Sequence, residues 1–393
     1  MRIFAIADFR RLWLAGLMVF VVRWLEMLVF AVFAYRQTGS AFVVAMLTML
    51  RLLPMGLFGA FMGAWAERME RGRAMVLIVL GMLASSATLA VLAWAGQLQV
   101  WHLGVAAFVN GIGWATDNPV RRLMVGEVVG AERMSLAMSV DIGTNNASRM
   151  LGPTLGGVLL AQAGIGGSFA LCVVLYLVAL VACLRLRYRN TVMPAGGGAV
   201  LARVADGLAL AWRDPRLRGT FVVTIVFNLF GWPFTSMVPV IAQDHLRLST
   251  EGIGLLASLD GVGAFCGAVA VALLVRPRSY AAIYVAGCAV YCGMVTLFAL
   301  APHTALAAFA LLMVGIGGAG FSIMQATLVY LAAPVEMRSR ALGVLSVCIG
   351  LGPIGFFNLG LMADAMGAQS ATVATGLEGL AALALTWPMW RKI

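Results

Sequence analysis

Two ionisable side chains lie three positions apart inside a long apolar run near the start of the chain. The stretch FVVRWLEMLVF, residues 20–30, contains Arg23 and Glu26, and the apolar run around it extends from about Leu12 to Tyr35. A run of this length can cross a bilayer, which takes about 20 apolar residues. The i,i+3 spacing puts both groups on one face of a helix. At that depth an arginine can hold an anionic group through its planar guanidinium, and a carboxylate can take up and release a proton.

Further polar residues occur near the middle of other apolar runs. Arg51, Arg149 and Asp260 are each expected at mid-depth. In one run, Asp141, Asn145 and Arg149 recur every four residues, which gives one polar stripe along a helix. Ionisable groups inside a membrane span usually face the bundle interior or a water-filled cavity. We therefore expect a polar ring at mid-membrane, with three arginines from the first half of the chain and an acid from the second.

Two interpretations of these residues stay open. In the structural one, Glu26 pairs with Arg23 or Arg51, and Asp141 pairs with Arg149, so that neighbouring helices are held in register. In the functional one, Arg23 or Arg51 holds an anionic substrate group and an acid carries a coupling proton. The proton-coupling candidates are Glu26, Asp260 and Asp141. The substrate-binding candidates are Arg23, Arg51, Asn145, Arg149, Asn228, Trp232 and Gln325.

The composition places all of these residues in an integral membrane protein. Of the 393 residues, 62% are hydrophobic and 11% are charged, and the mean hydropathy is +0.97. Such a chain has too few polar residues to coat soluble domains. The first apolar run exceeds the roughly 7–15 residues of a cleavable signal, so we expect a permanent helix there. The only lysine is Lys392, which excludes a P-loop with its GK[ST] lysine. The cysteines and histidines have no metal-ligand spacing, so we expect no metal, no cofactor and no enzymatic activity.

Hydropathy divides the chain into about twelve spans. The expected fold class is all-α, with twelve transmembrane helices in two pseudo-symmetric six-helix halves. We expect an N-terminal half over 1–186, a cytoplasmic linker over 187–215 and a C-terminal half over 216–393. The expected spans are 12–35, 41–63, 75–95, 101–121, 136–161, 167–185, 217–241, 252–275, 280–300, 304–331, 341–362 and 370–390.

The basic residues predict the orientation of these spans. With the N-terminus in the cytoplasm, 22 of the 27 basic residues fall on the cytoplasmic side, and only Arg36 and Arg247 fall outside. This bias is the positive-inside pattern of a multi-pass inner-membrane protein with both termini in the cytoplasm. The net charge of +11 is thereby explained by topology, so we expect no nucleic-acid partner.

An internal repeat supports the division into halves. The segment ADFRRLWLAG from Ala7 aligns with RDPRLRGTFV from Arg213. The segment RMLGPTLGG, residues 149–157, has a counterpart in CIGLGPIGF, residues 348–356. A six-span unit used twice in parallel orientation is one of the repeat types of secondary transporters.

The loop after the second expected span resembles the signature of a transporter superfamily. GAWAERMERGR, residues 63–73, is similar to the Gly-x-x-x-Asp-Arg-x-Gly-Arg-Arg motif of the major facilitator superfamily, with Glu67 in place of Asp. In that family the loop forms a cytoplasmic latch. The resemblance, which covers essentially the whole chain, implies a gating role for Gly63, Glu67, Arg68 and Arg71.

Two further segments extend the resemblance. Arg149–Gly157 resembles the fifth-span motif of the family's antiporters, which implies gating positions at Gly152 and Pro153. PVEMRSRALG, residues 334–343, is similar to a segment of the branch that includes the enterobactin exporter. By the same analogy, Asp117 is expected in the cytoplasmic latch with Arg68.

The function that these features predict is secondary active transport. We expect proton-coupled export of an amphipathic or anionic small molecule by rocker-switch alternating access, in a monomer surrounded by lipid bilayer. Two alternatives stay open: an importer or lipid flippase of the same fold, for example for siderophore or lysolipid uptake, and a membrane receptor that has lost transport. The sequence GIGGAG, residues 315–320, lies inside an apolar span with no preceding strand. It therefore predicts close helix packing and not nucleotide binding.

Overall fold

A computed structural model describes residues 2–66, 70–188, 209, 212–334 and 337–393, and no strand occurs among them. The first six long helices form what we call the N-terminal bundle: α1 (Ala7–Thr38), α2 (Ala41–Ala66), α3 (Arg71–Trp94), α4 (Val100–Val129), α5 (Met134–Gln162) and α6 (Gly164–Leu184). The C-terminal bundle contains α8 (Pro215–Val226), α9 (Val238–Asp244), α10 (Thr250–Leu274), α11 (Tyr280–Leu300), α12 (Thr304–Ala332), α13 (Arg338–Ile349), α14 (Gly352–Met366), α15 (Ala368–Leu385) and α16 (Trp387–Trp390).

Most of the expected spans are present as long apolar helices. Nine helical segments of the described chain are long and apolar enough to cross a membrane. The spans expected at 101–121, 136–161 and 370–390 are the helices α4, α5 and α15, which carry more polar residues. Most of the linker expected over 187–215 lies outside the described residues, so that domain division stays a prediction.

Local sequence sets where several helices begin and end. Gly39 ends α1 in the left-handed conformation at φ 64°, and its N–H donates to the Tyr35 carbonyl. Asp214 caps α8 by accepting a hydrogen bond from the Arg216 N–H, with Pro215 in the first turn. Ser249 caps α10 in the same manner through the Gly252 N–H.

The two bundles differ in the helix that opens each of them. The helix α1 is continuous over 32 residues. Its counterpart is broken into α8, a π-helical turn over Phe227–Gly231, a 3-10 segment over Trp232–Ser236, and α9. Pro233 and Pro239 supply no backbone N–H, and this explains why regular α-helix does not continue through the segment.

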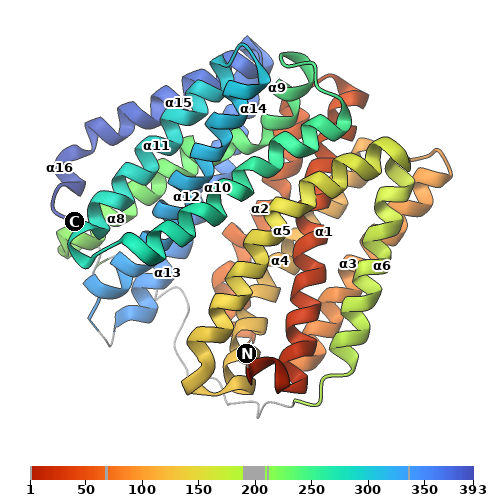
Figure 1. The fold of residues 1–393 in the computed structure, drawn as a ribbon, viewed down its shortest axis with the longest axis horizontal. Helices are drawn as coiled ribbons and strands as arrows, with labels where there is room; N and C mark the ends of the chain where they lie inside the picture. Colours follow the sequence, from red (N-terminus) through yellow and green to blue (C-terminus); the bar gives the residue numbers. More distant parts are fainter. Residues whose placement is uncertain (1, 67–69, 189–208, 210–211, 335–336) are drawn as a thin grey trace.

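The bundles lie side by side and are joined along two helix pairs, α5 with α10 and α2 with α14 (Figure 1). We call the end where α1 begins and α16 finishes the termini end. Figure 1 shows the bundles converging at the opposite end and diverging at the termini end, between α13 and α4.

One contact between α5 and α10 is made by backbone alone. A Cβ added at Gly157 would lie 3.0 Å from the Gly254 Cα and 2.7 Å from the Thr250 carbonyl oxygen. Contacts this short exclude any side chain at either glycine. The counterpart segment of the repeat behaves alike, since a Cβ at Gly56 would lie 2.8 Å from the Gly350 carbonyl oxygen.

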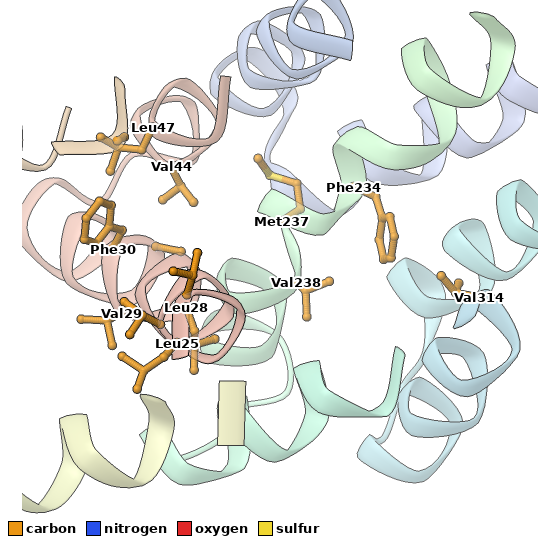
Figure 2. Packing of buried hydrophobic residues seen from close by; sticks show 14 of the residues in the cluster. Leu25, Leu28, Val29, Phe30, Val44, Leu47, Phe234, Met237, Val238 and Val314 are labelled. Atoms are coloured by element: carbon orange, nitrogen blue, oxygen red, sulfur yellow. The ribbon is translucent and has the colours of Figure 1, made fainter. Parts of the chain in front are cut away.

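Apolar packing continues from one bundle into the other. Figure 2 shows Leu25, Leu28 and Val29 on α1 near Val44 on α2, with Met237 from the C-terminal bundle close by. All of them belong to one buried cluster that extends across both bundles. In the C-terminal bundle, Gly315 of the GIGGAG segment packs so closely on α10 that a Cβ would lie 2.1 Å from the Asp260 carbonyl oxygen. Close helix packing is therefore the use of that segment.

Candidate functional site

A cavity lies between the two bundles and is lined by side chains from both of them. It encloses about 960 Å³ of empty space, open solvent at its mouth included. Its walls are mainly apolar and aromatic, and four charged side chains reach it. The lining residues come from α1, α2, α4, α5, the 3-10 segment over Trp232–Ser236, α9, α10, α12 and α14. They are Arg23, Trp24, Met27, Leu28, Ala31, Thr48, Arg51, Leu52, Trp114, Arg149, Pro153, Trp232, Phe234, Thr235, Ser236, Val238, Pro239, Ala257, Asp260, Leu311 and Phe356.

Arg23 lies on the cavity wall between aromatic rings. Its guanidinium carbon is 4.6 Å from the centre of the Trp114 ring and 5.2 Å from that of Phe20. The nearest carboxylate oxygen is Asp117 Oδ2, 4.0 Å from Nη2. Nη2 has no hydrogen-bond partner among the described residues although the residue is only 5% exposed. A buried guanidinium without a close carboxylate keeps donors available for an anionic ligand.

Glu26 is fully buried and does not line the cavity. Its carboxylate accepts hydrogen bonds from Ser86 Oγ at 2.6 Å, Asn110 Nδ2 at 2.8 Å and Arg51 Nη2 at 3.3 Å. These partners come from three different helices, so the carboxylate ties α1 to α2, α3 and α4. Of the two pairings open for Glu26, the structure contains the one with Arg51, and this arrangement fits the structural interpretation.

The nitrogens of the Arg51 guanidinium therefore differ in their partners. Its Nη2 is engaged by Glu26, whereas Nε and Nη1 are buried and have no partner among the described residues. Because Arg51 also lines the cavity, its remaining donors add to those of Arg23.

The partner predicted for Asp141 is wrong. Asp141 pairs with Arg121 of α4 and not with Arg149 of its own helix. Arg121 also donates to Asp117 Oδ2 at 3.3 Å. The sequence placed Arg121 at the cytoplasmic edge of a span that ended there, but α4 continues to Val129 and the side chain is 1% exposed.

Asp117 likewise lies in the interior of the N-terminal bundle. Its neighbours are Arg121 and Arg23, and it is 1% exposed. The expected partner Arg68 lies outside the described residues, so the structure gives Asp117 an interior role and does not describe the latch contact.

Arg149 pairs with Asp260, and this ion pair joins α5 of one bundle to α10 of the other. The Arg149 guanidinium also lies 5.4 Å from the centre of the Trp24 ring. Asp260 Oδ1 and Arg149 Nε remain buried without a partner among the described residues. The three arginines and the acid expected to come together, Arg23, Arg51, Arg149 and Asp260, thus line a single cavity.

The remaining substrate-binding candidates divide into two groups. Trp232 lines the cavity and packs edge-on against Phe356. Asn145, Asn228 and Gln325 are not among the lining residues. The last two belong to a network inside the C-terminal bundle, where Asn228 donates to the Thr224 carbonyl at 2.8 Å and Gln325 donates to Thr224 Oγ1 at 3.1 Å.

The comparison with known proteins decides the family. The model of the Major Facilitator Superfamily matches residues 12–357. The chain belongs to the Major Facilitator Superfamily. It is 25% identical to the Multidrug efflux pump Tap of Mycolicibacterium fortuitum over 355 residues, which are 88% of this chain and 86% of Tap. It is 21% identical to the Staphyloferrin A transporter of Staphylococcus aureus over 267 residues, 67% of this chain and 65% of the relative.

Solved structures agree on the fold. The nucleoside transporter NupG, in a mutant form, superposes with a TM-score of 0.80 at 10% identity, covering 97% of this chain and 99% of that one. As a member of this superfamily, the protein is a multi-pass membrane transporter and not an enzyme.

Of the gating positions that the superfamily motif implies, only some lie in the described residues. Glu67 and Arg68 fall outside them, and Gly63 is described only as part of the α2 backbone. Arg71 begins α3 and pairs with Glu127 of α4, which also accepts a hydrogen bond from Tyr188 Oη. These contacts tie α3 and α4 together at the termini end within one bundle.

The fifth-span motif packs α5 against two different helices. A Cβ at Gly152 would lie 2.5 Å from Trp24 Cβ, so this glycine lets α5 approach α1. The carbonyl oxygen of Pro153 would lie 2.5 Å from a Cβ at Gly254, on the other bundle. The motif therefore holds the fifth helix at the junction of the two bundles.

The opposite end of this transporter carries contacts between the bundles that the sequence did not reveal. Tyr35 Oη donates to Asp244, and Arg36 Nη2 donates to Thr250 Oγ1 at 2.6 Å. The first contact joins the end of α1 to the last residue of α9, and the second joins it to the first residue of α10. From the sequence, Arg36 was expected only as one of two basic residues on the side away from the cytoplasm, and that position predicts no partner.

Proposed function

We propose that this superfamily member is a proton-coupled secondary transporter that exports an anionic, amphipathic small molecule. The observation that carries the proposal is the central cavity, in which three arginines and Asp260 stand among apolar and aromatic walls. Cavities of this kind sit at the interface of the repeats in secondary transporters, where substrate and coupling ion bind.

The free donors favour an anionic substrate group. Arg23 Nη2 and Arg51 Nε and Nη1 are buried without a partner among the described residues. A carboxylate or phosphate between these two arginines would accept charge-assisted hydrogen bonds, which are about twice as strong as neutral ones. The rings of Trp24, Trp114 and Trp232 would pack against the apolar body of the same molecule.

Asp260 is the proton carrier that the arrangement favours. It lines the cavity, and its ion pair with Arg149 crosses between the bundles. Protonation of Asp260 would remove the charge that holds this pair together, and so would shift the balance between the two orientations of the bundles. Glu26 fits the task less well, because three donors from other helices surround its carboxylate away from the cavity.

The direction of transport rests on two supports. Tap, among the relatives, is a multidrug efflux pump. The basic surplus favours a cytoplasmic location of the termini end. With that orientation, the conformation described here, with the bundles converging at the opposite end, would load substrate from inside the cell. Uptake through the same cavity is the alternative, and the Staphyloferrin A transporter among the relatives keeps it open.

Purified protein in proteoliposomes tests this proposal. A pH gradient, acidic on the side opposite the termini, should drive an anionic amphipathic dye such as a carboxyfluorescein ester toward the acidic side. Asp260→Asn should abolish the gradient dependence, while Asp364→Asn on the exposed face of α14 serves as the matched control. Gradient-driven movement that survives Asp260→Asn contradicts Asp260 coupling. Movement only toward the termini side supports the uptake alternative.

A further inference from the structure

A groove on the outer face of the N-terminal bundle lies between α1 and α6 at the termini end. It encloses about 830 Å³ of empty space, open solvent included, and has an apolar floor with an arginine on each side of its mouth. Its lining residues are Arg11, Leu14, Val174, Leu177, Val178, Val181, Ala182 and Arg185. The groove shares no residue with the central cavity, although α1 contributes side chains to both.

The apolar floor follows one helix away from the mouth. Val181, Val178 and Val174 lie at helical spacing on α6, and each is at least 39% exposed. From Arg185 back to Val174 the helix rises by roughly 16 Å at 1.5 Å per residue, about the depth of one leaflet of a bilayer whose hydrocarbon core is about 30 Å thick. The floor therefore has the length and polarity that an acyl chain needs.

The mouth of the groove is held in place and is positively charged. Asp8 Oδ1 accepts hydrogen bonds from Arg11 Nη1 at 2.7 Å and from the Arg187 backbone N–H at 3.2 Å. One carboxylate thus fixes the start of α1 to the segment after α6. Arg11 keeps further N–H donors, and Arg185 is exposed and forms no ion pair within the described chain. Two acids lie near these arginines, Asp8 and Glu127, and Glu127 already pairs with Arg71.

The C-terminal bundle shows what occupies the corresponding place. There the first helix, α8, is covered at the termini end by the segment that follows α15. At Gly219 an added Cβ would lie 2.8 Å from Ile393 Cγ1 and 3.0 Å from the Trp390 Cα. In the N-terminal bundle the chain after α6 leads the other way, toward Glu127, where Tyr188 donates its hydroxyl hydrogen. The described residues leave the groove without such a cover.

We propose that the α1–α6 groove is a binding site for an anionic phospholipid, with the phosphate between Arg11 and Arg185 and one acyl chain along the α6 valines. Basic groups at the membrane boundary attract anionic lipid headgroups, and the apolar floor takes the chain that a soluble anion lacks. The site is separate from the transport proposal and stands or falls without it.

Lipid binding to the full-length protein in phosphatidylcholine nanodiscs tests the site, with phosphatidylglycerol as the probe. The wild type should bind phosphatidylglycerol in preference to phosphatidylcholine. Arg11→Gln and Arg185→Gln should each weaken the preference roughly fivefold, and together roughly thirtyfold. The control is Arg278→Gln, an exposed arginine of the C-terminal bundle at the same end, which should change nothing.

A second variant tests the acyl-chain floor. Val178→Trp should fill the groove with an indole ring, much as Trp390 covers α8, and should abolish lipid binding. The control is Val91→Trp on the exposed face of α3, which should leave lipid binding unchanged. Unchanged phosphatidylglycerol preference in both the arginine and the Val178 variants overturns the site. Displacement of the lipid by an equal concentration of inorganic phosphate overturns the lipid assignment and indicates a free-anion site.

Discussion

The interiors of the two bundles are built from different chemistry. In the described part of the N-terminal bundle, six side chains buried at mid-helix are charged: Arg23, Glu26, Arg51, Asp117, Arg121 and Asp141. In the described part of the C-terminal bundle, the buried polar residues are hydroxyls and amides, and Asp260 is the only buried charge. That one charge is paired with Arg149 of the other bundle.

Aromatic stacking takes the place of the charges in the C-terminal bundle. Phe321 stacks on Phe227 with ring centres 3.9 Å apart and on Tyr284 at 5.0 Å. Tyr284 Oη donates to the Thr220 carbonyl at 2.7 Å. Such contacts are neutral, and protonation does not change them. Among the described residues, the helices of the N-terminal bundle are therefore held together by buried charges, whereas those of the C-terminal bundle are held together by neutral contacts.

The difference teaches where a transporter of this fold can be sensitive to charge. In a pair such as Glu26 with Arg51, both partners lie inside one bundle. The Arg149–Asp260 pair spans the junction, so its strength depends on the relative position of the bundles. A change of charge matters most for the conformational equilibrium where the two partners belong to bodies that separate.

The largest effect is expected from breaking the charged interior. Arg121→Leu leaves Asp117 and Asp141 buried without their shared cation, and breaking a buried pair in this way typically costs about 3–5 kcal/mol. We expect a large drop in the detergent-unfolding midpoint or a loss of folded protein. Tyr284→Phe in the C-terminal bundle is the comparison, and should cost only about 1 kcal/mol. Equal losses in the two variants would remove the distinction between the bundles.

A charge exchange tests whether the ion pair between Arg149 and Asp260 is required for transport. Arg149→Asp alone puts two acids together and should abolish gradient-driven transport. The double variant Arg149→Asp with Asp260→Arg restores opposite charges across the same contact and should recover part of the transport rate. The readout is initial rate in proteoliposomes. A double variant no better than the single one would mean that the identity of each residue, and not the pairing, is required.

Arg23 and Glu26 should separate affinity from stability. Arg23→Gln removes a cavity-lining donor without a close carboxylate, so apparent substrate affinity should fall about tenfold or more, a typical loss for one charge-assisted hydrogen bond. The unfolding midpoint should change little. Glu26→Gln should do the reverse, because its three partners are structural. The two are measured by ligand titration and thermal unfolding, and identical profiles for both variants would refute the separation.

The smallest effect is expected at the opposite end. Tyr35→Phe removes one hydrogen bond to Asp244 between the bundles, which is worth about 0.5–1.5 kcal/mol. The population with that end open should rise by a factor of about two to ten. Labelling of a single cysteine placed at Ala41, which is 8% exposed at the start of α2, reports this opening in a background without the native cysteines, with Tyr280→Phe at the termini end as the control. A labelling rate that does not change would show that the contact does not hold this end closed.

The sequence predicted the class of fold and singled out the four charged residues that line the cavity. Long apolar runs and the Arg bias depend on the bilayer itself, so they can be read without knowing any contact. For the same reason Arg23, Arg51, Arg149 and Asp260 were expected at mid-depth, and all four line one cavity. The repeat located the two glycine motifs that bring α5 and α14 close to their neighbours.

Partners between helices were much harder to predict. The four-residue spacing of Asp141 and Arg149 shows that they share a face of one helix, but their partners, Arg121 and Asp260, come from other helices. Arg121 was misplaced because hydropathy ends a span where charges begin, whereas backbone hydrogen bonding carries α4 on to Val129. Ser86 and Asn110, which bind Glu26, gave no signal at all, since a single hydroxyl or amide in an apolar run barely changes its hydropathy.

The contact of Gly157 with Gly254 has a mechanical consequence. Because only backbone atoms meet there, no side-chain rotamer has to change when the angle between α5 and α10 changes. No side chains interlock at that point, so the two helices can change their crossing angle about this contact without repacking. An alanine at either glycine would put a methyl group into this contact and force the two helices apart.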